Sequence, residues 1–447
     1  MEDLKLDRKR TILVGFAFLS ISAFWQMYDS VIPLILTNNF HINESWSGVV
    51  MAADNVLALF LLPLFGSLSD KCTSKLGRRR PYILRGTLMA VVLMMFLPIL
   101  DNSYFAAPAA WKMVLFIVVL ALLLITMGTY RSPAVALMPD VTPKPLRSKG
   151  NAIINLMGSV GGIFFLLVSS VLYSSKRTAG LEHVSYVPLF AVVACVMLVA
   201  LCIIMLFVDE PKLAARAKEY EEQHPEHDHE AAITDATGEI SPAVKRSLGF
   251  LLASIALWFI GYNGVTTWFT TYANRMWGMA LGDASKCLTV ATAAAILTFI
   301  PAGNLASRIG RKKTILAGVA LLAGCFFSAF VYTMMYHTFH PILLVMFALV
   351  GMAWAMINVN SLPMVVEMCK GSDVGKFTGY YYTFSMAAQT ITPIVAGTLL
   401  NRVSYKALFP YSTFFVAASF VTMLFVKHGD SKLGTKKGLE AFDAMDD

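Results

Sequence analysis

The stretch GSLSDKCTSKLGRRR at residues 66–80 decides the fold, because it is a short, basic turn between two long apolar segments. The flanking segments, residues 46–69 and 82–101, each approach or exceed the 20 or so apolar residues that a helix needs to cross a bilayer. A shorter version, GNLASRIGRKK, recurs at residues 303–313 after another apolar segment. The sequence therefore predicts a membrane protein with two repeated halves.

The composition excludes most other classes of protein. Of the 447 residues, 57% are hydrophobic and 14% are charged, whereas soluble domains carry about 25% charged residues. This excludes a water-soluble enzyme, and the same composition argues against collagen-like, disordered and disulfide-rich chains. Twelve apolar segments are expected to span the membrane: 11–37, 46–69, 82–101, 111–139, 150–173, 186–208, 247–274, 283–306, 313–336, 341–366, 378–400 and 407–427.

We therefore expect an all-α membrane protein with 12 transmembrane helices in two pseudo-symmetric six-helix bundles. Residues 1–208 form the expected N-terminal bundle and residues 247–427 the C-terminal one, joined by a solvated linker at 209–246 and followed by a tail at 428–447. Trp111 and Trp277, at the ends of expected spans, are interpreted as anchors at the membrane interface.

The basic residues predict the orientation. By our count, 28 of the 36 Lys and Arg residues lie on the side that holds both termini, and seven lie on the other side. Because cytoplasmic loops are enriched in basic residues, both termini are expected to be cytoplasmic, in a multi-pass protein of the cell membrane. The formal charge of +8 is therefore no indication of nucleic-acid binding.

Two sequence runs carry a resemblance to a known family. The run from Gly66 to Ile83 resembles the loop between helices two and three of the glycoside–pentoside–hexuronide:cation symporters of the major facilitator superfamily, nearest to the sucrose-carrier-like branch. Ala136-Leu-Met-Pro-Asp140, with Arg147 and Asn151, resembles the end of their fourth helix. The resemblance implies proton-coupled symport of a sugar or glycoside by alternating access.

The basic loop also suggests a cytoplasmic gate, in which ion pairs close the inner side in one state and break in the other. The alternative is that these arginines only follow the topology and bind anionic lipid headgroups. The candidate gate residues are Gly66, Asp70, Gly77, Arg78, Arg79, Arg80, Asp140, Arg147, Arg311 and Glu367.

Three charged residues lie within expected spans, where a charge costs at least about 2.5–3.5 kcal/mol. Asp29 and Asp54 are each eight residues from the outer end of their span, so they are expected at one depth, with Arg131 deeper. Two carboxylates at one depth in a low-dielectric cavity cannot both ionise cheaply, so one is expected to hold a proton. We assign proton coupling to Asp54 and sugar binding to Asp29, and the opposite assignment stays open. A structural hydrogen bond or a snorkelling arginine is the alternative for each.

Polar and aromatic side chains near these charges are typical of sugar sites, where a ring face packs on the sugar and polar groups bind its hydroxyls. The expected substrate-binding residues are Trp25, Gln26, Tyr28, Asp29, Arg131, Tyr262, Asn263, Trp268, Asn358, Tyr381 and Gln389. For any one aromatic residue, packing is the alternative interpretation.

The chain departs from its relatives at the coupling site. Ala58 and Leu62 stand where the sodium-using melibiose carriers have paired aspartates, and Leu123 aligns near an acidic residue of the plant sucrose carriers. We therefore expect the proton rather than sodium to be the coupling ion, at a relocated site.

No catalytic residues, metal site or cofactor are expected, and the chain is interpreted as a monomeric carrier in the lipid bilayer rather than an enzyme. Two other functions stay open: a carrier of amphipathic lipids or drug-like solutes, and a non-transporting membrane sensor.

Overall fold

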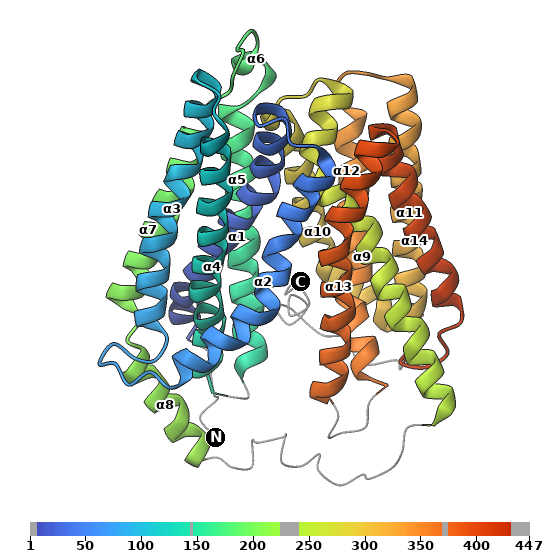
Figure 1. The fold of residues 1–447 in the computed structure, drawn as a ribbon. Helices are drawn as coiled ribbons and strands as arrows, with labels where there is room; N and C mark the ends of the chain where they lie inside the picture. The colour runs from blue at the N-terminus through green and yellow to red at the C-terminus, as the bar shows by residue number, and fades with distance from the viewer. Residues whose placement is uncertain (1–6, 144–145, 224–240, 369–373, 431–447) are drawn as a thin grey trace. The chain divides into compact units, whose positions relative to one another are not determined.

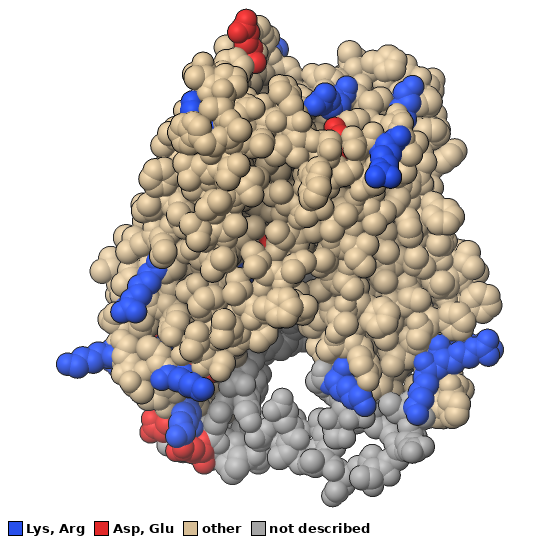
Figure 2. All heavy atoms as spheres, in the orientation of Figure 1, with Lys and Arg blue, Asp and Glu red and all other residues tan. Residues whose placement is uncertain are grey.

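The computed structural model describes residues 7–143, 146–223, 241–368 and 374–430, and the described residues form helices without strands. Twelve of these helices are long and apolar enough to cross a membrane, as the sequence predicts. Figure 2 shows that charged side chains on the drawn face gather toward the two ends of the helices, with few charged side chains between them. The chain is therefore a multi-pass membrane protein.

The helices divide into two compact units (Figure 1). The first unit comprises residues 1–41, 53–172 and 176–228, and the second comprises residues 42–52, 173–175 and 229–447. The helices of the chain up to the expected linker are α1 (Arg8–Leu34), the π-helix η1 (Ile35–Asn39), α2 (Glu44–Asp70), α3 (Arg80–Ala106), α4 (Ala110–Val141), α5 (Arg147–Leu172), α6 (Ser175–Thr178) and α7 (Val187–Phe207).

The remaining helices are α8 (Glu210–Gln223), α9 (Pro242–Trp277), α10 (Leu281–Ile309), α11 (Arg311–Met335), α12 (Ile342–Val366), α13 (Val374–Arg402), the 3₁₀ helix η6 (Tyr405–Ala407) and α14 (Leu408–Leu424). The expected domain boundaries stay a prediction, but helix α8 lies inside the segment expected to be a solvated linker.

The two units repeat one packing pattern. In the first unit, α1 packs against α5 and α7, and α3 packs against α4 and α7. In the second unit, α9 packs against α13 and α14, and α11 packs against α12 and α14. Helices with apolar residues on all sides, as here, bury some faces against one another and leave others for lipid. The repeated loop sequences therefore belong to equivalent places in two similar bundles.

Local sequence signals explain where several helices begin and bend. The Asp7 side chain accepts the backbone N–H of Arg10 (3.2 Å), which caps the start of α1. Pro33 removes one backbone donor from α1, and the chain continues as the π-helix η1, in which the Thr37 hydroxyl donates to the Pro33 carbonyl (2.8 Å). The irregular turn follows Asp29 by only a few residues.

The interpretation of Trp277 as an interface anchor is wrong. Helix α9 runs three residues beyond the expected end and stops at Gly278, whose φ is +60°. Trp277 thereby lies inside the second unit, 2% exposed, with its ring edge-on to Tyr272 and Tyr332. Trp111 is 63% exposed, as an interface anchor would be.

Candidate functional site

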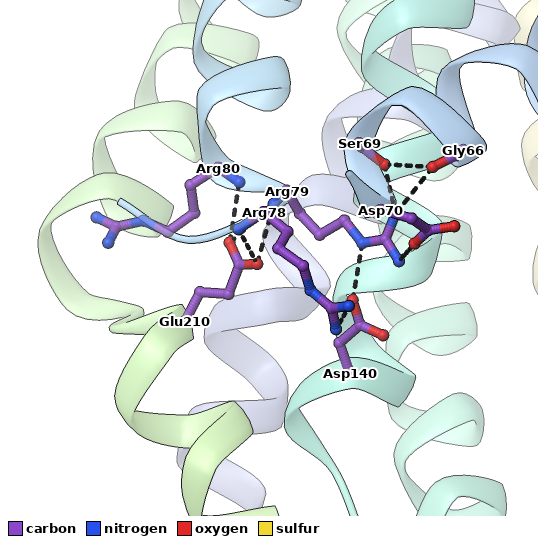
Figure 3. Close-up of polar contacts among 8 residues, drawn as sticks. All are labelled: Gly66, Ser69, Asp70, Arg78, Arg79, Arg80, Asp140 and Glu210. Carbon is purple, nitrogen blue, oxygen red and sulfur yellow. Dashed lines mark hydrogen bonds and ion pairs between the residues drawn. The ribbon is translucent and has the colours of Figure 1, made fainter. Parts of the chain in front are cut away.

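The guanidinium of Arg79 is the centre of a polar network at the end of the first unit that holds the basic turn (Figure 3). It lies between the end of α2 and the end of α4, and its side chain is 6% exposed. Its Nε donates to Asp140 Oδ2 (2.7 Å), its Nη2 donates to Asp70, and its Nη1 donates to Ser69 and to the Gly66 carbonyl. We call these five residues, Gly66, Ser69, Asp70, Arg79 and Asp140, the arginine cluster.

The arginine cluster holds the Arg79 cation between two carboxylates, those of Asp70 and Asp140. Burial alone would lower the pKa of the Arg79 guanidinium, but the hydrogen bond and charge of Asp140, together with Asp70, raise that pKa above its ordinary value. Arg78 adds a looser ion pair to Asp140 at 3.6 Å, and about half of its side chain is exposed. The cluster therefore ties α2, α3 and α4 together through one buried cation.

A third acidic residue, Glu210, binds the turn from the other side (Figure 3). Its Oε1 accepts the backbone N–H groups of Arg78 (2.7 Å) and Arg79 (2.9 Å), and its Oε2 accepts that of Arg80 (3.0 Å). Glu210 is 2% exposed, and the Arg80 side chain donates to the Met205 carbonyl at the end of α7. A carboxylate at the start of α3 satisfies backbone donors that the helix leaves unpaired.

The second unit has a simpler version of this arrangement. Arg311 forms an ion pair with Glu367, at the end of α12. The backbone N–H of Lys312 donates to Asp430 Oδ1 (3.2 Å), and the Lys312 ammonium donates to the Val426 carbonyl (2.6 Å). The two units therefore share one feature. In each, an acidic residue that follows the last spanning helix accepts backbone N–H groups from the turn after the repeated glycine: Glu210 after Gly77, and Asp430 after Gly310.

Sequence reasoning missed Ser69, Glu210 and Asp430. Glu210 and Asp430 each follow the last spanning helix of a half, so the same internal repeat that relates Asp140 to Glu367 could have pointed to them. Arg147 begins α5, but its side chain lies outside the described residues. The structure therefore brings the other candidate gate residues into two separate networks, one in each unit.

Three charged residues of the first unit lie within spanning helices and close enough to one another to interact electrostatically. Asp29 lies on α1, Asp54 on α2 and Arg131 on α4. Asp54 lies close enough to interact electrostatically with both Asp29 and Arg131, and its Oδ1 accepts from the side-chain amide of Asn55 (3.0 Å). A charge within a spanning helix is costly, and these three offset one another only in part because the acids outnumber the base.

Two aromatic residues of α1, Trp25 and Tyr28, lie near these charges. The Arg131 guanidinium lies 5.7 Å from the Trp25 ring centre, and the Trp25 ring is edge-on to Tyr28 at 5.5 Å. The Trp25 indole nitrogen is buried and has no hydrogen-bond partner among the described residues. Gln26 donates weakly to Ser30 (3.4 Å). This group offers carboxylate acceptors, an unused N–H donor and an aromatic face.

The second unit has its own group of neutral polar and aromatic side chains. Tyr262 stacks on Trp354 with ring centres 3.7 Å apart and planes within 4°. The neighbouring Asn263 amide nitrogen is buried without a hydrogen-bond partner among the described residues. The Tyr381 hydroxyl lies 3.5 Å from Asn358 Oδ1, and the Gln389 side chain on α13 is half-buried.

Trp268 takes a packing role in the structure. It is fully buried and its indole N–H donates to the Pro393 carbonyl (3.2 Å). Both its ring and its polar atom are therefore used inside the fold.

Comparisons with known proteins agree with this architecture. The Major Facilitator Superfamily matches residues 14–285 and 277–444. A bacterial homologue of the iron transporter ferroportin superposes with a TM-score of 0.70 at 12% identity, over 94% of this chain and 99% of the other. The nucleoside transporter NupG superposes with a TM-score of 0.65 at 12% identity, over 94% and 100% of the two chains. These structures support the fold alone.

Sequence relatives are sugar transporters. Sucrose transport protein SUC3 of Arabidopsis thaliana is 32% identical over 31% of this chain and 25% of its own length. Proton-associated sugar transporter A of Mus musculus is 31% identical over 26% of this chain and 16% of its own. The general alpha-glucoside permease of Schizosaccharomyces pombe is 23% identical over 53% of this chain and 43% of its own.

The matched regions span less than half of each of these relatives. The family match, in contrast, covers almost the whole chain. Together with the twelve candidate spans and the repeated units, it shows that the chain belongs to the Major Facilitator Superfamily, and its relatives are consistent with the sucrose-carrier-like branch.

Proposed function

We propose that this protein is a secondary active transporter that moves a sugar or glycoside together with a proton by alternating access. The observation that carries the proposal is the meeting of Asp29, Asp54 and Arg131 within the spanning helices of the first unit. The similarity to a sucrose transport protein and to a proton-associated sugar transporter supports the same substrate class and ion.

The geometry supports different roles for the two acids. Asp54 interacts with both Asp29 and Arg131, so a proton on Asp54 changes the electrostatic balance of the whole group. Asp29 neighbours Tyr28 and the aromatic face of Trp25 on the same helix, where a carboxylate can accept sugar hydroxyls. We therefore assign the proton to Asp54 and the sugar to Asp29, with Arg131 holding the unprotonated acid.

Unpaired donors in each unit support sugar binding. In the first unit the Trp25 indole N–H is buried without a partner among the described residues, and in the second unit the same holds for the Asn263 amide nitrogen. A buried unpaired donor costs about 1–3 kcal/mol, and a sugar hydroxyl oxygen that accepts from such a donor offsets this cost. The face of the partly exposed Tyr262 ring that is turned away from Trp354 suits the apolar side of a pyranose ring.

Two transport modes separate the proposed roles. In proteoliposomes, sugar accumulation driven by a pH gradient requires proton coupling, whereas sugar exchange between equal pools requires only sugar binding and the conformational change. We expect Asp54→Asn to lose gradient-driven accumulation but keep exchange, and Asp29→Asn to lose both. Asp209→Asn, an exposed carboxylate outside the spans, serves as the matched control.

If instead Asp29→Asn keeps exchange and Asp54→Asn loses both modes, the proton belongs to Asp29 and the sugar to Asp54. Wild-type protein that moves no sugar or glycoside in either mode would refute sugar transport, and accumulation that follows a sodium gradient would refute proton coupling. We further propose that the protein lies in the cell membrane as a monomer with both termini in the cytoplasm, and that the arginine cluster acts as a cytoplasmic gate.

A further inference from the structure

A partly open cavity lies in the first unit, and its lining contains none of the charged residues Asp29, Asp54 and Arg131. Its volume is about 250 Å³. The start of α1, the end of α4 and helix α8 form its walls, at the end of the unit that also holds the arginine cluster (Figure 1). Its apolar lining includes Val14, Met138, Leu146, Leu213 and Ala217.

Helix α8 turns one face toward the cavity and the other away. Leu213, Ala217 and Tyr220 recur at helical spacing and line the cavity, and Ala217 is 6% exposed. Lys218 and Glu222 form an exposed i,i+4 ion pair on the other face. The helix therefore covers an apolar space that the described residues leave unfilled.

Charged groups at the cavity favour an anion. Arg10, Arg216 and Asp7 belong to its lining, which leaves one positive charge in excess. Asp7 is already used twice, as the cap of α1 and as the ion-pair partner of Arg10 at 2.9 Å. Arg216 makes no ion pair or hydrogen bond with any described residue. A guanidinium in this position can bind a phosphate through two parallel hydrogen bonds.

We propose that this cavity binds an anionic phospholipid of the surrounding membrane, with the phosphate at Arg216 and Arg10 and the apolar part of the lipid against Val14 and Leu213. The volume is below the range of about 300–1,000 Å³ that holds a whole small molecule, so only part of the lipid enters. Basic pockets at the ends of spanning helices suit anionic headgroups, and the lining here adds an apolar floor. The proposal is independent of the transported substrate.

A lipid titration tests this site on the full-length protein. Purified protein in neutral detergent is titrated with dioctanoyl phosphatidylglycerol, and its apparent Tm is followed by tryptophan fluorescence. A ligand that binds only the folded state raises the apparent Tm. We expect phosphatidylglycerol to raise it, and neither dioctanoyl phosphatidylcholine nor inorganic phosphate to do so at the same concentrations.

Charge variants locate the effect. Arg216→Gln should weaken the apparent affinity about tenfold, as the loss of a charge-assisted hydrogen bond predicts. Lys218→Gln, two residues along α8 on its outer face, should leave the affinity unchanged. Asp7→Asn, which can still cap α1 through its amide oxygen, should strengthen binding because it removes the negative charge of the cavity.

Three results would overturn the proposal. Equal stabilisation by phosphatidylcholine would mean that the headgroup charge is not recognised. Equal stabilisation by inorganic phosphate would mean an anion site without a lipid. Unchanged affinity in Arg216→Gln, or weaker binding in Asp7→Asn, would mean that lipid binds elsewhere on the protein.

Discussion

The carboxylate of Glu210 lies directly against Gly77, in the space that a side chain at position 77 would occupy. Gly77 has φ of +105°, a conformation that residues with a Cβ rarely adopt, and the three residues that follow it donate their backbone N–H groups to Glu210. The turn and the acid therefore depend on each other: glycine makes room for the carboxylate, and the carboxylate holds the turn.

Gly77→Ala should lower the apparent Tm more than backbone strain alone would. The positive φ costs about 1–2 kcal/mol, and the added methyl group also displaces Glu210. Gly180→Ala is the matched control, because Gly180 has φ of +78° and nothing within 4 Å of its Cβ position. Equal losses in the two variants would show that Glu210 does not restrict this site. Thermal unfolding of the purified variants measures both.

Glu210→Gln should destabilise the protein by about 1.5–3 kcal/mol, because it replaces a charged acceptor of several backbone N–H groups with an amide whose nitrogen faces donors. Glu222→Gln on the same helix removes only an exposed ion pair of 3.5 Å and should change the free energy of unfolding by less than about 0.5 kcal/mol. Denaturation in mixed micelles gives both values. A loss in Glu210→Gln no larger than in Glu222→Gln would argue against the role of the Glu210 carboxylate.

Arg79→Lys should destabilise the protein by about 1.5–3 kcal/mol, because it keeps the positive charge but loses charge-assisted hydrogen bonds of the arginine cluster. A lysine cannot bind Asp140, Asp70 and Ser69 at once, because its ammonium lacks the planar fork of the guanidinium. Arg78→Lys is the control, since Arg78 is half exposed and makes one ion pair at 3.6 Å. If the cluster also gates transport, the initial rate of sugar uptake should fall in Arg79→Lys at a temperature where the variant stays folded.

Stability should fall as the pH drops below about 6.5, the ordinary value for histidine. His183, on the loop before α7, stacks on Phe105 and lies 2.8 Å from Asn102 Oδ1, and burial lowers its pKa. A lowered pKa means that the unfolded chain binds the proton more readily, so the stabilisation is complete above 6.5 and is lost toward lower pH. The nearby Asp101 carboxylate, 3.5 Å away, opposes this shift and keeps the effect small.

His183→Gln isolates this contribution. The variant should be less sensitive to pH between about 5 and 7 than the wild type, as measured by apparent Tm across that range. His340→Gln, an exposed histidine before α12, should leave the wild-type slope intact. A steeper slope in His183→Gln would show that Asp101 outweighs burial and that the protonated ring stabilises the fold.

Tyr262→Ala should raise the concentration of sugar that half-saturates exchange, because the proposed pyranose packs on the Tyr262 ring. Trp354 is buried and stacks on one face of Tyr262, so the other face of the partly exposed Tyr262 ring is the one that the variant removes. Trp268→Phe is the contrast: it removes the indole bond to Pro393 inside the core and should lower the apparent Tm with little effect on the concentration of sugar that half-saturates exchange. The reverse pattern would place the sugar elsewhere.

The sequence alone determined the features that depend on composition and period. Twelve apolar segments predict twelve spanning helices whatever their neighbours are, because a helix satisfies its own backbone in lipid. The repeated Gly-Arg pairs, Gly77-Arg78 and Gly310-Arg311, indicated two related halves. The cost of a charge in a bilayer identified Asp29, Asp54 and Arg131 as candidate functional residues. The prediction for Trp277 failed because α9 continues to a cap at Gly278, which places the Trp277 ring inside the second unit.

Only the tertiary structure decided which of these groups meet. The pairing of Arg79 with Asp70 and Asp140, and of Arg311 with Glu367, depends on how the ends of separate helices pack, which no spacing along one chain encodes. Glu210 looks in sequence like one acid among several in a polar segment. It becomes the partner of the 78–80 backbone because the end of α7 is packed against the start of α3, and an acceptor there satisfies N–H groups that the helix leaves unpaired.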